Sequence, residues 1–101
     1  MTQEKHLLQL SAPLRDKLDE PLAQLCNGGL APRGRVAILV LCDRDAVEAV
    51  SQQVSRLGGT ARHQLLRIGA IAAWMPLSAV EPLARLASVL RLELEQSFTI
   101  A

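Results

Sequence analysis

The side chains that most often carry catalysis are scarce in this 101-residue chain. Its imidazoles are His6, close to the amino terminus, and His63, in a segment that we predict below as an outer strand. A hydrolytic site needs a nucleophile beside a positioned base, and no Ser or Cys stands in a spacing that signals one. Cys26 and Cys42 lack the Cys-x-x-Cys spacing of a redox or metal site, which favours two ordinary reduced thiols. We therefore expect neither an enzyme nor a bound metal or cofactor.

Two acidic residues near the carboxyl end share one face of a predicted strand, and the two aromatic residues are candidates for contacts outside the core. Glu93 and Glu95 alternate with leucines, so their two carboxylates project from one face of a strand, opposite the leucines. The plain alternative is that they belong to the solvated face of an edge strand. Trp74 and Phe98 are the only aromatic residues, and a core built from Leu, Val, Ile and Ala leaves either one available for contacts outside it.

Composition excludes several classes of protein. Hydrophobic residues make up 50% and charged residues 21% of the chain, as in ordinary globular proteins, and 101 residues suffice for one domain. The formal net charge is +1 without a basic run, so nothing supports nucleic-acid binding. No apolar stretch reaches the roughly 20 residues that span a bilayer, and the polar amino terminus lacks a signal-peptide pattern. We expect a cytoplasmic protein that binds neither nucleic acid nor membrane.

The first third of the chain carries a leucine stripe that predicts helix. Pro21 interrupts the pattern and Asp19 is placed to cap a second helix, so we expect one kinked helix or two short ones. Glycines after Asn27 end the helix, and a linker leads to a boundary at Gly34. Residues 1–33 are therefore predicted as a helical extension and linker. The stripe consists of Leu14, Leu18, Leu22 and Leu25.

Residues 34–95 predict strands and helices in alternation. An apolar run at 36–42, rich in β-branched side chains, predicts a central strand. Segments 61–68 and 70–75, on either side of Gly69, predict a hairpin. Alternation with charged residues predicts a half-buried closing strand with Leu90, Leu92 and Leu94 on its buried side.

Capping boxes predict where the two helices of this region begin, at Asp45 with Glu48 and at Ser78 with Glu81. Gly58-Gly59 supplies the left-handed stop of the first helix. The resulting order, β-α-β-β-α-β, predicts an α+β fold. It is a ferredoxin-like antiparallel sandwich with two helices on one sheet face, the other face open, and an extra N-terminal helical segment.

Three segments together resemble the subtilisin propeptide and inhibitor family: Gly58-Gly59 after the first helix, the hairpin residues 69–73 reading Gly-Ala-Ile-Ala-Ala, and the closing residues 89–95. The family's usual pattern is a Gly-Gly after the first helix, a Gly-Phe-Ser-Ala-like third strand and a last strand reading Val-x-x-Val-Glu-x-Asp. The spacing fits this pattern without an insertion, and the resemblance covers residues 34–101.

This resemblance implies an inhibitor of a subtilisin-like serine protease, with residues 34–95 as the inhibitor domain and its open sheet face packed on two surface helices of the protease. Glu93 and Glu95, carried over by motif, would meet the N-termini of those helices, where unpaired amides and the positive dipole end stabilise an anion. The tail, 96–101, would lie in the active-site cleft as a substrate-like strand. It would place Phe98, Thr99, Ile100 and Ala101 there, with Ala101 just before the position of the cleaved bond; alternatively, Phe98 folds back onto the domain's own core.

The sequence departs from the family at three places and leaves alternatives open. Glu95 stands where Asp is usual, Ile71 where an aromatic is common, and the N-terminal third has no counterpart. Trp74, expected on the open face, is either an interface anchor or a residue covered by the N-terminal helix. A folding chaperone acting in trans would use the same contacts as an inhibitor. The rival from another class is a non-inhibitory ferredoxin-like regulatory module that forms a homodimer through its sheet, and the N-terminal helix offers a second homodimer surface.

Overall fold

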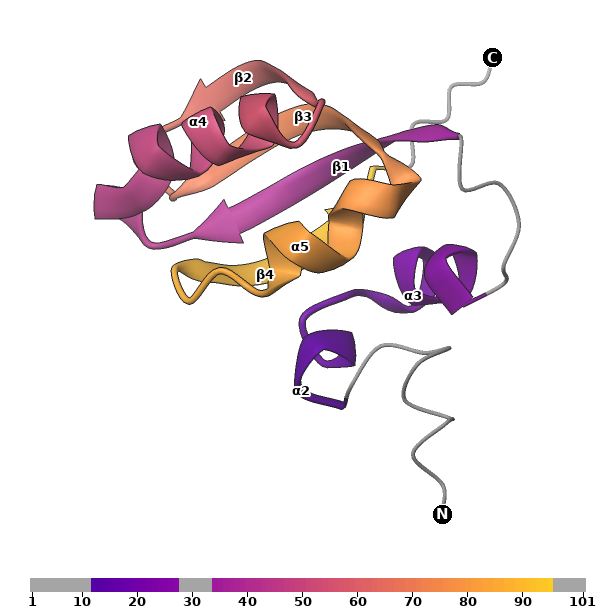
Figure 1. The fold of residues 1–101 in the computed structure, drawn as a ribbon. Helices are drawn as coiled ribbons and strands as arrows, with labels where there is room; N and C mark the ends of the chain where they lie inside the picture. Colours follow the sequence, from indigo (N-terminus) through magenta and orange to yellow (C-terminus); the bar gives the residue numbers. More distant parts are fainter. Residues whose placement is uncertain (1–11, 28–33, 96–101) are drawn as a thin grey trace.

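The computed structural model describes residues 12–27 and 34–95, which form an α+β structure around a four-stranded antiparallel sheet (Figure 1). Two short helices come first, and strands and helices then alternate along the chain. The elements are α2 (Ala12–Arg15), α3 (Glu20–Asn27), β1 (Arg35–Cys42), the 3-10 turn η1 (Arg44–Ala46), α4 (Val47–Arg56), β2 (Thr60–Leu65), β3 (Ala70–Pro76), the 3-10 turn η2 (Leu77–Ala79), α5 (Val80–Ala84) and β4 (Val89–Leu94).

Strand β1 lies in the interior of the sheet, whose order is β2-β3-β1-β4 with every neighbouring pair antiparallel. This position confirms the central strand predicted from the apolar run. Ile38 and Val40 are buried on one face, whereas Leu39 and Leu41, which alternate with them, are partly exposed on the other. The strands at the two edges of the sheet are β2 and β4.

Helices α4 and α5 cover one face of the sheet (Figure 1). The side chains of Val47, Val50 and Val54 in α4 are buried, and α5 buries Val80 and Leu83 in the same way. The side chains of both helices and those of the facing strand residues belong to one buried cluster. Burial of each large aliphatic side chain in it contributes roughly 1.5–3 kcal/mol.

Both helices begin differently from the capping boxes that the sequence predicts. The N-cap residues are Ala46 for α4 and Ala79 for α5, and neither cap has a side-chain hydrogen bond. Asp45 lies inside η1 and Ser78 inside η2, because each helix is entered through a 3-10 turn that starts before the expected cap. Both capping-box predictions are therefore wrong, although the helices themselves are present.

The Gly58-Gly59 pair ends α4 as predicted, and the two glycines have different reasons to be there. Gly58 has a φ of +91°, in the left-handed region that other residues disfavour. At Gly59 a Cβ would collide with Met75 Sδ and would lie 2.7 Å from the Trp74 carbonyl oxygen. Only glycine lets the chain leave α4 this close to β3.

Bulges in both edge strands change the alternation that the sequence predicts. In β4 the bulge makes Leu90 the extra residue, 55% exposed, and Val89 takes the buried position instead. The predicted burial is therefore wrong for Leu90 and right for Leu92, which has no exposed surface. In β2 a second bulge makes Arg62 the extra residue.

The N-terminal segment forms two short helices that lie beside β4 and α5 (Figure 1). The Leu92 N–H donates to the Lys17 carbonyl oxygen at 2.7 Å, and the Asp19 N–H donates to the Leu92 carbonyl oxygen at 3.0 Å. These two bonds place Leu18 in a parallel bridge with Leu92. The segment also contributes side chains to the common core: Leu18, Leu22 and Ala23.

Asp19 ties this segment to the sheet with both of its carboxylate oxygens. Oδ1 accepts the Leu22 N–H at 3.0 Å, which confirms the predicted cap of α3. Oδ2 accepts the Leu94 N–H, an amide on the outer edge of β4, at 3.1 Å. Lys17 adds a third tie, since its Nζ donates to the Ala84 carbonyl oxygen at 2.8 Å. The described part of the predicted extension thus packs as part of the same core.

Candidate protein-binding face

No described helix lies on the sheet face opposite α4 and α5, and we call this surface the open face. The strand register arranges its residues in three rows that run from β2 to the β4 side. Apolar side chains occupy the middle of the face, and acidic side chains line its β4 side. The rows are Thr60, Trp74, Ala37 and Glu95; His63, Ala72, Leu39 and Glu93; and Leu65, Ala70, Leu41 and Arg91.

Trp74 is the largest side chain of the open face, and 42% of its surface is exposed. Its register partner on β1 is Ala37, which has a small side chain. The described parts of α2 and α3 pack against the β4 edge and the helix layer, so they do not cover Trp74. The sequence left two alternatives for Trp74, an interface anchor or a residue covered by the N-terminal helix. The described parts of α2 and α3 do not provide that cover.

Glu93 and Glu95 lie on the open face, on the same side of the chain, as their spacing predicts. Each carboxylate already has a cationic partner within the chain. Arg91 Nε lies 3.0 Å from Glu93 Oε2, and Arg62 Nη2 pairs with Glu95 Oε1. All four side chains are between 30% and 44% exposed, and ion pairs this open to water are worth only about 0–1 kcal/mol. A partner can therefore take over either carboxylate at small cost.

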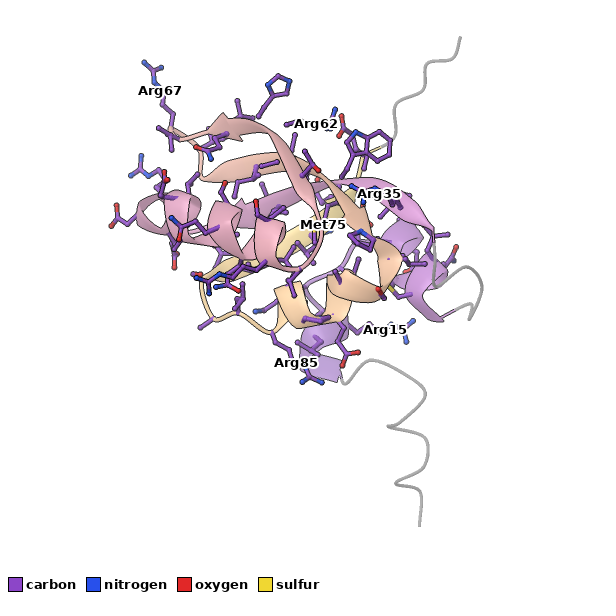
Figure 2. The ribbon with its side chains drawn as sticks, turned by 45° about the horizontal axis from the view of Figure 1, so that its top comes forward. Arg15, Arg35, Arg62, Arg67, Met75 and Arg85 are labelled. Atoms are coloured by element: carbon purple, nitrogen blue, oxygen red, sulfur yellow. The ribbon has the colours of Figure 1, made fainter. Side chains whose placement is uncertain are left out.

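Arg62 is the residue of this site that sequence reasoning misses. It stands on β2, whereas Glu95 follows β4, so the ion pair joins the two opposite edges of the sheet. Its guanidinium carbon lies 5.7 Å from the centroid of the Trp74 ring, within the range of a cation–π contact. The side chain of Arg62 is labelled in Figure 2. No local pattern could reveal this contact, because it depends on the strand order and on the bulge in β2.

The chain stays on the sheet up to the last described residue. The Glu95 N–H donates to the Ala37 carbonyl oxygen at 2.8 Å, which extends the pairing of β4 with β1 by one residue. The predicted tail residues lie outside the described part of the chain, so their predicted contacts stay a prediction. They are Phe98, Thr99, Ile100 and Ala101.

The turn between β2 and β3 carries exposed apolar side chains that sequence reasoning also overlooks. Leu65, Leu66 and Ile68 are 44%, 59% and 65% exposed, and together with Gln64 and Arg67 they line a shallow surface pocket. Leu65 belongs to the last row of the open face, so the apolar surface continues from the face into this turn. The adjacent Leu65 and Leu66 break the alternation expected in the hairpin segment 61–68, and this is the sequence signal that could have indicated it.

No protein-family model matches the chain, and no curated protein matches it either.

The described residues include two free cysteines, Cys26 and Cys42. Burial is the main cause that raises the pKa of both thiols; the neighbouring charge of Glu81 adds to it at Cys26, and that of Asp43 at Cys42. Both thiols are therefore protonated at neutral pH and poor nucleophiles. Within residues 12–27 and 34–95, no group of His, Cys, Asp and Glu side chains is placed to hold a metal ion. No helix among them is long and apolar enough to cross a membrane.

Proposed function

We propose that this protein inhibits a subtilisin-like serine protease by packing its open face on the protease surface and laying its tail in the active-site cleft. The observation that carries this proposal is the geometry of β4: Glu93 and Glu95 line the side of an uncovered sheet face, and the chain passes from Glu95 directly into the tail. Two of the three motifs that resemble subtilisin propeptides, residues 69–73 and 89–95, lie along β3 and β4, which help to build this face.

The fold that we propose for the domain is a ferredoxin-like sandwich. The order β2-β3-β1-β4, with two helices in one layer, supports it, because a β-α-β-β-α-β chain that places its first and third strands in the centre has this arrangement. Many unrelated functions use that fold, so it supports the functional proposal only together with the face.

The open face supplies the two kinds of contact that such a partner requires. Trp74 and Leu39 offer exposed apolar surface in its middle, and a partly exposed tryptophan is a common anchor of protein interfaces. Glu93 and Glu95 offer carboxylates at its margin, which the N-termini of two protease helices would receive through their unpaired amides. The apolar contact supplies affinity and the carboxylates fix the orientation.

The tail binds by backbone pairing with a strand of the cleft, with side-chain pockets providing selectivity. Phe98 fills an apolar pocket three residues before Ala101, whose small side chain enters the primary pocket. A chaperone that assists folding of the protease in trans would use the same two contacts.

Progress curves of several subtilisin-like proteases, recorded with the full chain and with a chain that lacks residues 98–101, test the proposal. Slow-binding inhibition by the full chain, and its loss in the shortened chain, is the expected result. Circular dichroism of the shortened chain controls for the fold. An absence of inhibition of every protease, with the full chain folded, would contradict the proposal.

A homodimer through the same face is the second candidate, and one observation favours it. The open face carries the exposed indole of Trp74, and its apolar surface continues through Leu65 into the turn between β2 and β3. Two copies related by a twofold axis would bury this apolar surface against each other. Sedimentation of the chain at micromolar concentration, compared with that of Trp74→Asp, separates the candidates: a wild-type dimer that becomes a monomer in the variant would favour this alternative.

A further inference from the structure

We infer that Arg62 is a built-in competitor for the carboxylate of Glu95, so that docking on the open face requires Arg62 to release Glu95 and withdraw from Trp74. This inference rests on the proposed function and concerns the same surface. It assigns to Arg62 the control of how readily the face accepts a partner.

The bulge in β2 makes this competition possible. Ala61 is the register partner of Ala73, and His63 is the partner of Ala72, so Arg62 is an extra residue between two regular pairs. Extra residues of this kind commonly aim a side chain in a direction that a regular strand does not allow. Here the side chain passes over Trp74 to the opposite margin of the sheet.

Small side chains leave the path across the face open. The row that Arg62 crosses contains Ala37 between Trp74 and Glu95. Since Ala37 does not rise above the backbone, the guanidinium reaches Glu95 while keeping its contact with the indole ring. The side chain therefore lies on the surface that a docked partner would occupy.

Arg62 also offers Glu95 the same kind of contact that the N-terminus of a partner helix would offer. A guanidinium offers cationic N–H donors to a carboxylate, and the N-terminus of a helix offers N–H donors with a positive dipole end. Either group can therefore satisfy the carboxylate of Glu95, whose side chain is 38% exposed. A partner helix must bind this carboxylate more strongly than Arg62 already does. Glu93 is not subject to this control from across the sheet, because its partner, Arg91, stands on its own strand.

The first arm of the test needs no protease. Trp74 is the only tryptophan and the chain has no tyrosine, so the intrinsic fluorescence of the free protein reports on this residue. Arg62→Gln and Glu95→Gln should shift the emission of Trp74 in the same direction, and the double variant should shift it no further. Arg91→Gln, which breaks the other ion pair, should leave it unchanged. An unaltered emission in Arg62→Gln would overturn the inference.

The second arm uses a protease that the wild-type chain inhibits. Arg62→Gln should lower the inhibition constant by about two- to fivefold, the range of an exposed ion pair, and should have no effect in a Glu95→Gln background. Arg56→Gln removes the same charge from α4 and should not lower the constant. Weaker or equal inhibition by Arg62→Gln would overturn the competition while the proposed function stands. If the wild-type chain inhibits no protease, the proposed function fails and the competition with it, whereas the emission arm still decides whether Arg62 holds Glu95 in the free chain.

Discussion

The two edge strands of the sheet differ in whether their outward backbone groups are paired within the chain. Along β4, the outward backbone groups of Leu92 pair with Lys17 and Asp19, and the Leu94 N–H pairs with the Asp19 carboxylate. Along β2, all residues but Ala61 are exposed, and the strand carries a bulge and a charged side chain. An uncovered edge invites pairing with other chains, and bulges and charges are common protection against it.

The covered edge is also the edge that the proposed function uses, so the chain is most rigid where it is proposed to bind. Strand β4 carries Glu93 and leads into the tail, and it is held between β1 on one side and the N-terminal segment on the other. A binding element fixed in advance loses less conformational entropy when it docks. The N-terminal segment therefore stabilises the strand that the proposed function uses most, while the open face stays accessible.

The largest effect should come from a buried residue by which the N-terminal segment joins the common core. Leu22 has no exposed surface, and Leu22→Ala should lower the free energy of unfolding by about 2–5 kcal/mol, because it leaves a cavity in the common core. Chemical denaturation followed by circular dichroism measures this. Leu25→Ala, on the same helix but 37% exposed, is the matched control and should change stability far less. Equal effects of the two variants would mean that the segment is not part of the cooperative unit.

A substitution of Trp74 tests the open face, in contrast to Leu22→Ala, which tests the segment that covers the β4 edge. Trp74→Ala should weaken binding to a responsive protease by about 2 kcal/mol or more, as loss of an interface anchor does. Because the Trp74 side chain is partly exposed in the free chain, Trp74→Ala should lower the free energy of unfolding less than Leu22→Ala does. Inhibition constants and denaturation curves of the same preparations check both statements. A loss of stability without a loss of affinity would make Trp74 a structural residue only.

Variants of Asp19 test how the outer edge of β4 is held by the N-terminal segment. Asp19→Ala should lower stability by about 1–2 kcal/mol, since it removes the cap of α3 and leaves the Leu94 amide without its acceptor. Asp19→Asn keeps an oxygen for only one of the two amides, so its loss should be smaller. Hydrogen exchange at the Leu94 amide should become faster in Asp19→Ala. Unchanged exchange there would show that the carboxylate does not seal the edge.

Loss of a contact to β2 should lower stability least. Gln64 Nε2 donates to Ser51 Oγ at 2.8 Å, the side-chain hydrogen bond that links β2 to α4. Ser51→Ala should lower the free energy of unfolding by about 0.5–1.5 kcal/mol, the net worth of a neutral hydrogen bond. A thermal melt is sufficient to measure it. A loss larger than that of Asp19→Ala would reverse the proposed ranking of the two edges.

Local sequence signals predicted the elements well where the decisive interactions are themselves local. The apolar run of β1, the cap at Asp19 and the left-handed glycine at Gly58 each depend on a few neighbouring residues, and all three predictions are confirmed. The capping boxes failed although they too are local, because Asp45 and Ser78 became part of 3-10 turns that lead from a strand into a helix.

Features that depend on cross-strand register could not be predicted. The exposure of Leu90 results from the bulge opposite β1, and the pairing of Arg62 with Glu95 requires the complete strand order and a second bulge. The same-face placement of Glu93 and Glu95 was predictable, since it follows from the period of a strand. That both carboxylates already have partners within the chain was not.

The inhibition constant of the double variant Glu93→Gln/Glu95→Gln against a responsive subtilisin-like protease tests the central claim most directly. Two carboxylates at helix N-termini, each worth about 0.3–1 kcal/mol, predict an inhibition constant roughly three- to thirtyfold higher than that of the wild-type chain. Glu48→Gln, an exposed change on α4 away from the open face, should leave the constant unaltered. An equal inhibition constant for the double variant and the wild-type chain would contradict docking through the acidic side of the open face.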